Sequence, residues 1–205
     1  MPKQERAMKT RAAILDAAAA EFDAHGYDGA RLDRIVERTG ATKGAVYFHF
    51  PSKIAIARAL REENPENWSA LVAEVMSTGL RGIDAAAEIT KRVGSIFAEN
   101  VQLRAAMKLG QTIFPAEERT NPYLPWIDLV TIFVEQAIAD GEVSGVDARE
   151  FATIAIHAFF GSYWLANELG TLGSLNSEIE QLWRVLSHVH SGSVREELTA
   201  PEFFV

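Results

Sequence analysis

The chain has 205 residues, no cysteine and a formal net charge of −8, and 48% of its residues are hydrophobic and 23% charged. These proportions are typical of a folded globular chain, and the lack of cysteine excludes disulfides, thiolate metal sites and cysteine nucleophiles. No apolar run approaches the roughly 18 to 20 residues of a membrane span, and the basic start leads into an amphipathic pattern rather than a signal peptide. We therefore expect a cytoplasmic protein without a membrane partner.

The charge is divided unevenly along the chain. Residues 1–62 carry 11 Lys and Arg against 8 Asp and Glu, whereas residues 63–205 carry 9 against 20. A basic end can bind phosphates even in an acidic protein, because exposed charges more than about 10 Å apart are largely screened at physiological salt. A chance fluctuation in charge is the alternative, so the division permits nucleic-acid binding without requiring it.

The hydrophobic pattern is helical throughout. Apolar residues recur at spacings of three and four, and no stretch alternates with a period of two, which predicts an all-α protein. In the N-terminal part, helices are predicted over Lys9–His25 before Gly26, over Leu32–Thr39 before Gly40, and over Lys43–Phe48 after a Thr42 cap. Two short helices joined by a turn that contains glycine are typical of a helix-turn-helix, here within residues 9–53.

The rest of the chain is predicted to be helical as well. One helix begins at Lys53 and ends near Gly79, with a kink or restart at Asn64-Pro65, because proline removes a backbone hydrogen bond. Further helices are predicted over Asp84–Glu99, Val101–Phe114, Tyr123–Asp140, Asp147–Leu169 and Ser177–His190. The predicted loops between them are Pro115–Pro122, Gly141–Gly145 and Gly170–Asn176.

The third predicted helix carries the chemistry that points to DNA. If Val46, Phe48 and Phe50 face the core, then Lys43, Gly44 and Tyr47 face outward at spacings of three and four. An ammonium such as that of Lys43 donates to guanine O6 or N7, and a glycine lets the backbone approach the bases closely. The expected phosphate ligands are Thr42, Tyr47, His49 and Lys53, the last of which opens a helix whose free N–H groups favour an anion.

Packing is the alternative for the aromatic residues of this segment. Aromatics at such spacings are usually core residues, which is our interpretation of Phe48 and Phe50. Tyr47 and His49 fit a core less well, because a buried hydroxyl or imidazole needs polar partners. Arg6, Lys9 and Arg11, near the start of the first helix, are further candidates for phosphates or a minor groove.

The run GYDGARLDRIVERTGATKGAVYFHFPSK, residues 26–53, resembles the DNA-binding signature of the TetR family of bacterial repressors. The resemblance implies a homodimer with a three-helix domain for duplex operator DNA, residues 1–53, and a larger helical domain for ligand binding and dimerisation, residues 54–205. It assigns the DNA contacts to Arg31, Thr42, Lys43, Gly44, Tyr47, His49 and Lys53.

One position departs from the pattern of the family. Ala30 and Arg31 stand where Ser or Thr usually opens the second helix, so the usual side-chain cap is missing. Our hypothesis is that Arg31 pairs with a phosphate instead.

Within the family, ATKGAVYFHFPSK together with the segment PYLPWIDL, residues 122–129, is similar to the γ-butyrolactone receptor branch. The similarity implies that Trp126 faces the ligand and that Tyr123 is a pocket position. Because a small lactone or furan needs an apolar cavity with a few placed donors, Phe97, Met107 and Phe160 are candidate walls and Gln111 is a candidate polar anchor. Core packing is the alternative for the three walls, and solvent exposure is the alternative for Gln111.

Two further residues are candidates for a ligand carboxylate. Lys108 and His157 lie on segments predicted to face inward, and the alternative for each is a solvated or core-satisfied side chain.

The last two long helices are predicted to form the dimer. Their apolar surface exceeds what a small domain hides easily, and burial within one chain is the alternative. The residues concerned are Phe159, Trp164, Leu165, Leu182, Trp183 and Leu186.

The expected function is that of a ligand-responsive repressor that binds a palindromic operator as a homodimer and is released by a small signalling molecule of the γ-butyrolactone, butenolide or furan type. The alternative is a pseudo-receptor or multidrug-responsive regulator that answers antibiotics or other lipophiles. An enzyme is not expected, because the carboxylates and histidines form no HExxH, no phosphate loop and no nucleophile with a base. No catalytic residue, metal site or cofactor is predicted.

Overall fold

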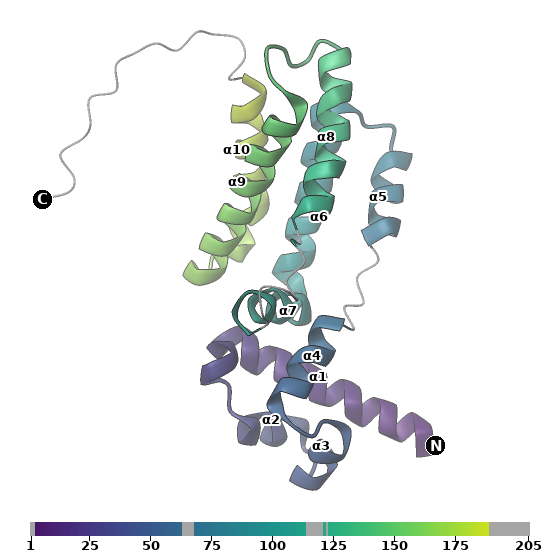
Figure 1. Ribbon diagram of the computed structural model, residues 1–205, viewed down its shortest axis with the longest axis vertical. Coiled ribbons are helices and arrows are strands. Elements are labelled where there is room, and N and C mark those ends of the chain that lie inside the picture. Colours follow the sequence, from purple (N-terminus) through teal and green to yellow (C-terminus); the bar gives the residue numbers. More distant parts are fainter. Residues whose placement is uncertain (1–2, 63–67, 114–120, 122, 189–205) are drawn as a thin grey trace, which may run out of the picture. The chain divides into compact units, whose positions relative to one another are not determined.

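The computed structural model describes residues 3–62, 68–113, 121 and 123–188 (Figure 1). Within these ranges every regular element is a helix, which confirms the predicted all-α class. The α-helices are α1 (Lys3–Gly29), α2 (Leu32–Thr39), α3 (Lys43–His49), α4 (Lys53–Glu62), α5 (Trp68–Ser77), α6 (Gly82–Glu99), α7 (Val101–Thr112), α8 (Leu124–Ala139), α9 (Ala148–Leu169) and α10 (Leu175–His188), and a 3-10 turn spans Leu172–Ser174. In this part of the chain, no helix combines the length and the apolar character that crossing a membrane requires.

The chain divides into two compact units. Unit 1 comprises Met1–Glu74 and Lys91–Pro122, and unit 2 comprises Val75–Thr90 and Tyr123–Val205. The division falls within α6, so the first half of this helix belongs to unit 2 and its second half to unit 1.

Unit 1 is built around α1, which packs against α7, α2 and α4. The face of α1 that the sequence predicts to be apolar is buried: Ile14, Ala18 and Phe22, spaced by four residues, are all fully inaccessible. Ile35 of α2 and Val46 of α3 reach the same core. Because each of these short helices is anchored by a buried side chain, the core of unit 1 fixes the orientation of α2 and α3.

Unit 2 packs α9 between α8 and α10. Its core includes Phe133, Phe159 and Tyr163, and the buried indole N–H of Trp183 donates to the Thr90 hydroxyl at 2.8 Å. Two residues that the sequence assigned to the dimer surface, Phe159 and Trp183, are therefore core residues of a single chain. For them the alternative of burial within one chain is correct.

Several helix ends carry capping residues, among them Gly40, which the sequence predicts. Gly40 and Gly170 adopt left-handed conformations at the ends of α2 and α9, and Asp147 caps α9 by accepting a hydrogen bond from the Glu150 N–H at 2.9 Å. Gly26 breaks α1 with φ 64° and ψ −177°, but the chain makes a further turn to Gly29, so the predicted stop is a kink. The predicted loop Gly170–Asn176 contains the 3-10 turn and the start of α10.

The Asn64-Pro65 kink, Phe114, His190 and most of the loop 115–122 lie outside the described residues.

Candidate DNA interface and effector site

The helix-turn-helix consists of α2 and α3 with Gly40, Ala41 and Thr42 between them. Gly40 has φ 64°, a left-handed conformation that glycine adopts without the steric cost of a Cβ. The Thr42 hydroxyl oxygen caps α3 by accepting from the Ala45 N–H at 3.2 Å. The cap uses the oxygen as an acceptor and leaves the hydroxyl hydrogen available for a phosphate.

The outward face of α3 carries Lys43, Gly44 and Tyr47, all of which are exposed, as the sequence predicts. A Cβ built on Gly44 would meet no atom within 4 Å, so the backbone there is open to an approaching surface. His49 is half-buried at the end of the helix. These side chains form one accessible surface on a helix that the core holds from behind.

The prediction for Phe48 is wrong. Val46 and Phe50 are buried as expected, whereas Phe48 is 83% exposed and contacts the ring of His49 edge-on. Val46 and Phe50 are four residues apart and share one side of a helical turn, so the residue midway between them points to the opposite side. The alternation of aromatic residues was misleading, because alternation orders side chains in a strand and not in a helix.

Lys43 is paired within the helix-turn-helix. Its ammonium donates to Asp33 Oδ1 of α2 at 3.1 Å, and both side chains remain largely exposed. The hydrogen bond to Asp33 and the charge of Asp33 raise the pKa of Lys43 above its usual value, so the side chain is a cation at any physiological pH. An exposed pair of this kind contributes little to stability and separates easily when another acceptor arrives.

Lys53 is placed differently from the other predicted DNA ligands. Its ammonium donates to the carbonyl oxygens of Tyr27 at 2.6 Å and Ala30 at 3.0 Å, and it lies 4.4 Å from the centre of the Tyr27 ring. Two of its three N–H groups therefore hold the corner between α1 and α2. The third is the donor that a phosphate contact would use.

Arg31 is the N-cap residue of α2, and no side chain caps this helix. The residue three positions after it, Arg34, also lacks the carboxylate of a capping box. A distant residue supplies the missing acceptor: Glu21 Oε1 of α1 accepts from the Arg31 backbone N–H at 3.2 Å. Glu21 is fully buried, and the Arg34 guanidinium lies 3.7 Å from its carboxylate.

Glu21 is not among the residues predicted to be functional, although its position in the sequence indicates a structural role. Glu21 lies seven residues after Ile14 and three after Ala18, on the buried face of α1. An acidic residue on a buried face must have hydrogen-bond partners, so its position there indicates that it anchors another part of the chain.

The predicted effector residues fall into both units. In unit 2, the rings of Tyr123 and Phe160 are 4.5 Å apart, and Trp126 is half-buried in the first turn of α8. In unit 1, Phe97 is buried and its ring lies 6.4 Å from that of Trp68, while Met107 is half-buried on α7. Gln111 is part of α7, but its side chain lies outside the described residues.

The two candidates for a ligand carboxylate have other surroundings. The Lys108 ammonium binds Asp23 of α1, and His157 is exposed on α9. The structure therefore favours a structural role for Lys108 and the solvated alternative for His157.

The exposure of Phe48 gives a direct stability test. Phe48→Ala is expected to change the free energy of unfolding by no more than about 0.5 kcal/mol, because the ring has little packing to lose. Phe50→Ala, the control in the core, is expected to lower it by about 3–5 kcal/mol. Equilibrium denaturation by urea measures both values, and similar losses in the two variants would contradict the exposed position of Phe48.

The unusual start of α2 gives a second test. Arg31→Ser is expected to raise the free energy of unfolding by about 1 kcal/mol, because it provides the missing side-chain cap. Glu21→Ala is expected to lower it by about 1.5–3 kcal/mol, the range for a lost hydrogen bond to a charged group. Equilibrium denaturation by urea measures these changes. Arg38→Ser, at the other end of α2, should bring no gain in stability, and a gain equal to that of Arg31→Ser would show that capping is not the cause.

Comparison with known proteins agrees with this geometry. The model for bacterial regulatory proteins of the tetR family matches residues 14–60, which include α2 and α3. The chain is 30% identical to the A-factor receptor protein of Streptomyces griseus over 198 residues, which cover 95% of this chain and 69% of the receptor. These regulators and receptors are not enzymes.

Solved structures agree as well. CprB from Streptomyces coelicolor, in complex with its operator sequence, matches with a TM-score of 0.73 at 27% identity, covering 88% of each chain. A γ-butyrolactone receptor matches with a TM-score of 0.64 at 25% identity, covering 88% of this chain and 98% of the receptor chain. The chain therefore belongs to the TetR family of bacterial transcription regulators.

Proposed function

We propose that the protein is a homodimeric repressor that binds a palindromic operator through its helix-turn-helix and is released by a small signalling molecule of the γ-butyrolactone, butenolide or furan type. The DNA-binding part rests on the placement of α3: Val46 on its rear is buried in the core, while Lys43, Gly44 and Tyr47 are exposed on its outer face. The effector class is supported by the likeness to the A-factor receptor and to a γ-butyrolactone receptor.

The exposed face of α3 suits a major groove. Lys43 would leave Asp33 and donate to guanine O6 or N7, while Gly44 allows close approach of the backbone. Tyr47 and Phe48 add apolar and polar surface at the edge of the groove. The phosphate contacts that position the helix are assigned to Arg31, Thr42, Tyr47, His49 and Lys53.

The dimer is assigned to α9 and α10. Ile154, Gly161 and Leu165 of α9 follow spacings of seven and four, lie on one side of the helix and are all exposed. Val185 of α10 is also exposed. Burying this apolar stripe against a second copy would produce a two-fold dimer, whose recognition helices read half-sites about 34 Å apart.

The working division of the chain follows from these roles. Residues 1–53 serve DNA binding, and residues 54–205 serve effector binding and dimerisation. A regulator of bacterial operators acts where the chromosome lies, so the assigned location is the cytoplasm.

The effector is assigned to the aromatic residues around the start of α8. Tyr123 and Phe160 form one aromatic contact, and Trp126 lies one turn after Tyr123. An apolar ring system with an indole N–H and a phenol hydroxyl suits a small lactone, which has a compact apolar body and one or two acceptors.

The phosphate contact of Arg31 is testable through salt dependence. Arg31→Ala is expected to weaken operator binding and to reduce the slope of log K against log salt concentration by about one unit, because one fewer counterion is released. Fluorescence anisotropy with a labelled operator between low and moderate salt measures the slope. Arg149→Ala, which removes an arginine of unit 2, is the control, and an unchanged slope for Arg31→Ala would exclude the phosphate contact.

The whole proposal is tested by a gel-shift assay on DNA upstream of the protein's own coding region. The protein is expected to shift a palindromic site, and a compound from a panel of γ-butyrolactones, butenolides, furans and antibiotics is expected to release it. The lack of any palindromic target would contradict the regulator, and release by antibiotics alone would favour the pseudo-receptor.

The role of Trp126 is tested in the same assay. Trp126→Ala should keep operator affinity within about threefold and lose release, because the effector binds away from α3. Leu124→Ala, an exposed position in the same turn of α8, should behave as wild type. Normal release from Trp126→Ala would remove Trp126 from the effector site.

A further inference from the structure

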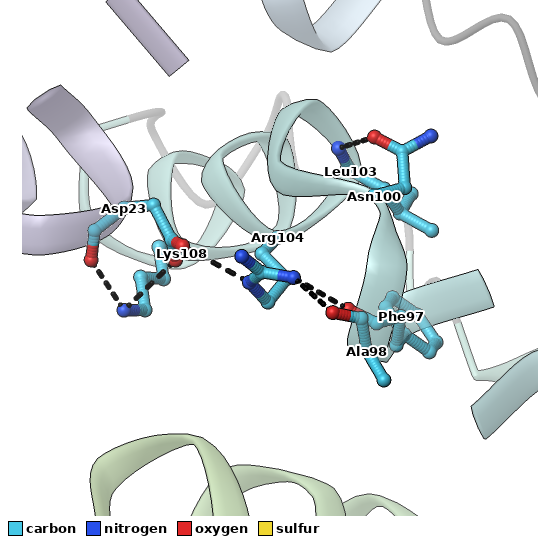
Figure 2. Close-up of polar contacts among 7 residues, drawn as sticks. All are labelled: Asp23, Phe97, Ala98, Asn100, Leu103, Arg104 and Lys108. Atoms are coloured by element: carbon cyan, nitrogen blue, oxygen red, sulfur yellow. Dashed lines mark hydrogen bonds and ion pairs between the residues drawn. The ribbon is translucent and has the colours of Figure 1, made fainter. Parts of the chain in front are cut away.

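Three charged side chains meet where α1, α6 and α7 come together in unit 1 (Figure 2). Asp23 lies on α1 and Arg104 and Lys108 on α7, and we call the three residues the Asp23 joint. Their side chains are only 16%, 11% and 21% exposed, respectively. Neither the proposed DNA contacts nor the proposed effector contacts use this cluster.

Arg104 connects the end of α6 to α1. Its Nε donates to Asp23 Oδ2 at 3.0 Å, and its Nη1 donates to the carbonyl oxygens of Phe97 at 3.0 Å and Ala98 at 2.7 Å. These carbonyls belong to the last turn of α6, where helical partners are missing and a positive charge is favoured. One guanidinium therefore ties the end of α6 to α1.

Lys108 binds the same residue of α1 from the next turn of α7. Its ammonium donates to the Asp23 backbone carbonyl at 2.6 Å and lies 3.2 Å from Asp23 Oδ1. Asp23 is three residues before the kink at Gly26, after which the chain turns into α2. The Asp23 joint thus holds α1 just before the corner that leads to the helix-turn-helix.

Stability alone is a poor explanation for such a cluster. Removing charges from water is costly, and replacing a buried ion pair by well-packed apolar residues is often neutral or stabilising. The arginine fork instead provides a fixed geometry, because its planar donors hold three oxygens at once. This geometry makes the position of α1 depend on the position of the end of α6.

α6 also links the two units through the chain itself. Its first half belongs to unit 2, where Glu142 accepts from the Ile83 N–H at 3.1 Å, and its last turn is held in unit 1 by Arg104. A displacement of α6 that begins in unit 2 would therefore reach α1 through Arg104.

We propose that Arg104 and Asp23 are positioning residues that couple the position of α6 to the helix-turn-helix. Breaking the bond between them would then prevent effector binding from releasing the operator. The inference rests on the proposed repressor function. It assigns these two residues a role in regulation and none in contact with DNA or effector.

The test uses the fact that coupling between two sites acts in both directions, so it needs no effector. If α6 and the helix-turn-helix are coupled, operator binding must change the stability of the joint just as movement of the joint changes operator affinity. Hydrogen exchange of the full-length dimer, with and without an operator duplex, reports both regions. In the wild type, operator should slow exchange in α2 and α3 and change exchange over residues 97–108 by about fivefold or more.

In Arg104→Met the protection of α2 and α3 should persist, while the change over residues 97–108 falls below about twofold, well under the usual range of coupling. Asp23→Asn, which keeps the size of the side chain, should give the same result. It therefore tests the coupling even if Arg104→Met does not fold. Arg149→Met removes the exposed Arg149–Asp128 pair in unit 2 and should keep the wild-type response. A purely structural role would lower protection everywhere, with or without operator.

Two results would overturn the coupling. One is a wild-type change over residues 97–108 that survives in both joint variants, and the other is protection of α2 and α3 in the wild type without any change over residues 97–108. If no duplex protects α2 and α3, the DNA-binding function itself fails, and the role of the joint fails with it.

Discussion

The corner between α1 and α2 is the constraint on which the DNA-reading surface depends. α2 and α3 have eight and seven residues, and isolated helices below about 12 residues are marginal in water. Around the break at Gly26, charged side chains from three helices bind backbone groups. Glu21 holds the start of α2, Lys53 holds the carbonyls of Tyr27 and Ala30, and Lys108 holds that of Asp23.

This arrangement divides the positive charges of unit 1 between two tasks. Lys53, Arg104 and Lys108 bind backbone carbonyls of the same chain and are at least half-buried, whereas the Arg31 side chain and the Lys43–Asp33 pair are exposed at the surface. The modest positive balance of the N-terminal 62 residues is therefore a poor measure of the charge offered to DNA. The placement of each cation decides how much charge DNA meets, because exposed cations act on phosphates at short range and charges more than about 10 Å away are largely screened.

Local patterns predicted the helices and their ends well. Periodicity places α1 to α3 and α6 to α10, and Gly40 and Thr42 end and begin their helices as the sequence predicts, because capping is decided by neighbouring residues. Long-range pairs could not be predicted. Glu21 meets Arg31 ten positions later and Asp23 meets Arg104 eighty-one positions later, and periodicity identifies a buried face without naming its partner. The predicted burial of Phe48 was wrong because an alternating pattern was applied to a helix.

The position of α7 decides how an effector could act. Residues 91–122 belong to the same compact unit as the helix-turn-helix, although the predicted functional boundary lies at residue 53. Met107, a candidate wall of the effector site, stands on α7 between Arg104 and Lys108. A displacement of α7 therefore acts directly on its contacts with α1, and a shift of about one ångström suffices to separate hydrogen bonds as short as those of Asp23.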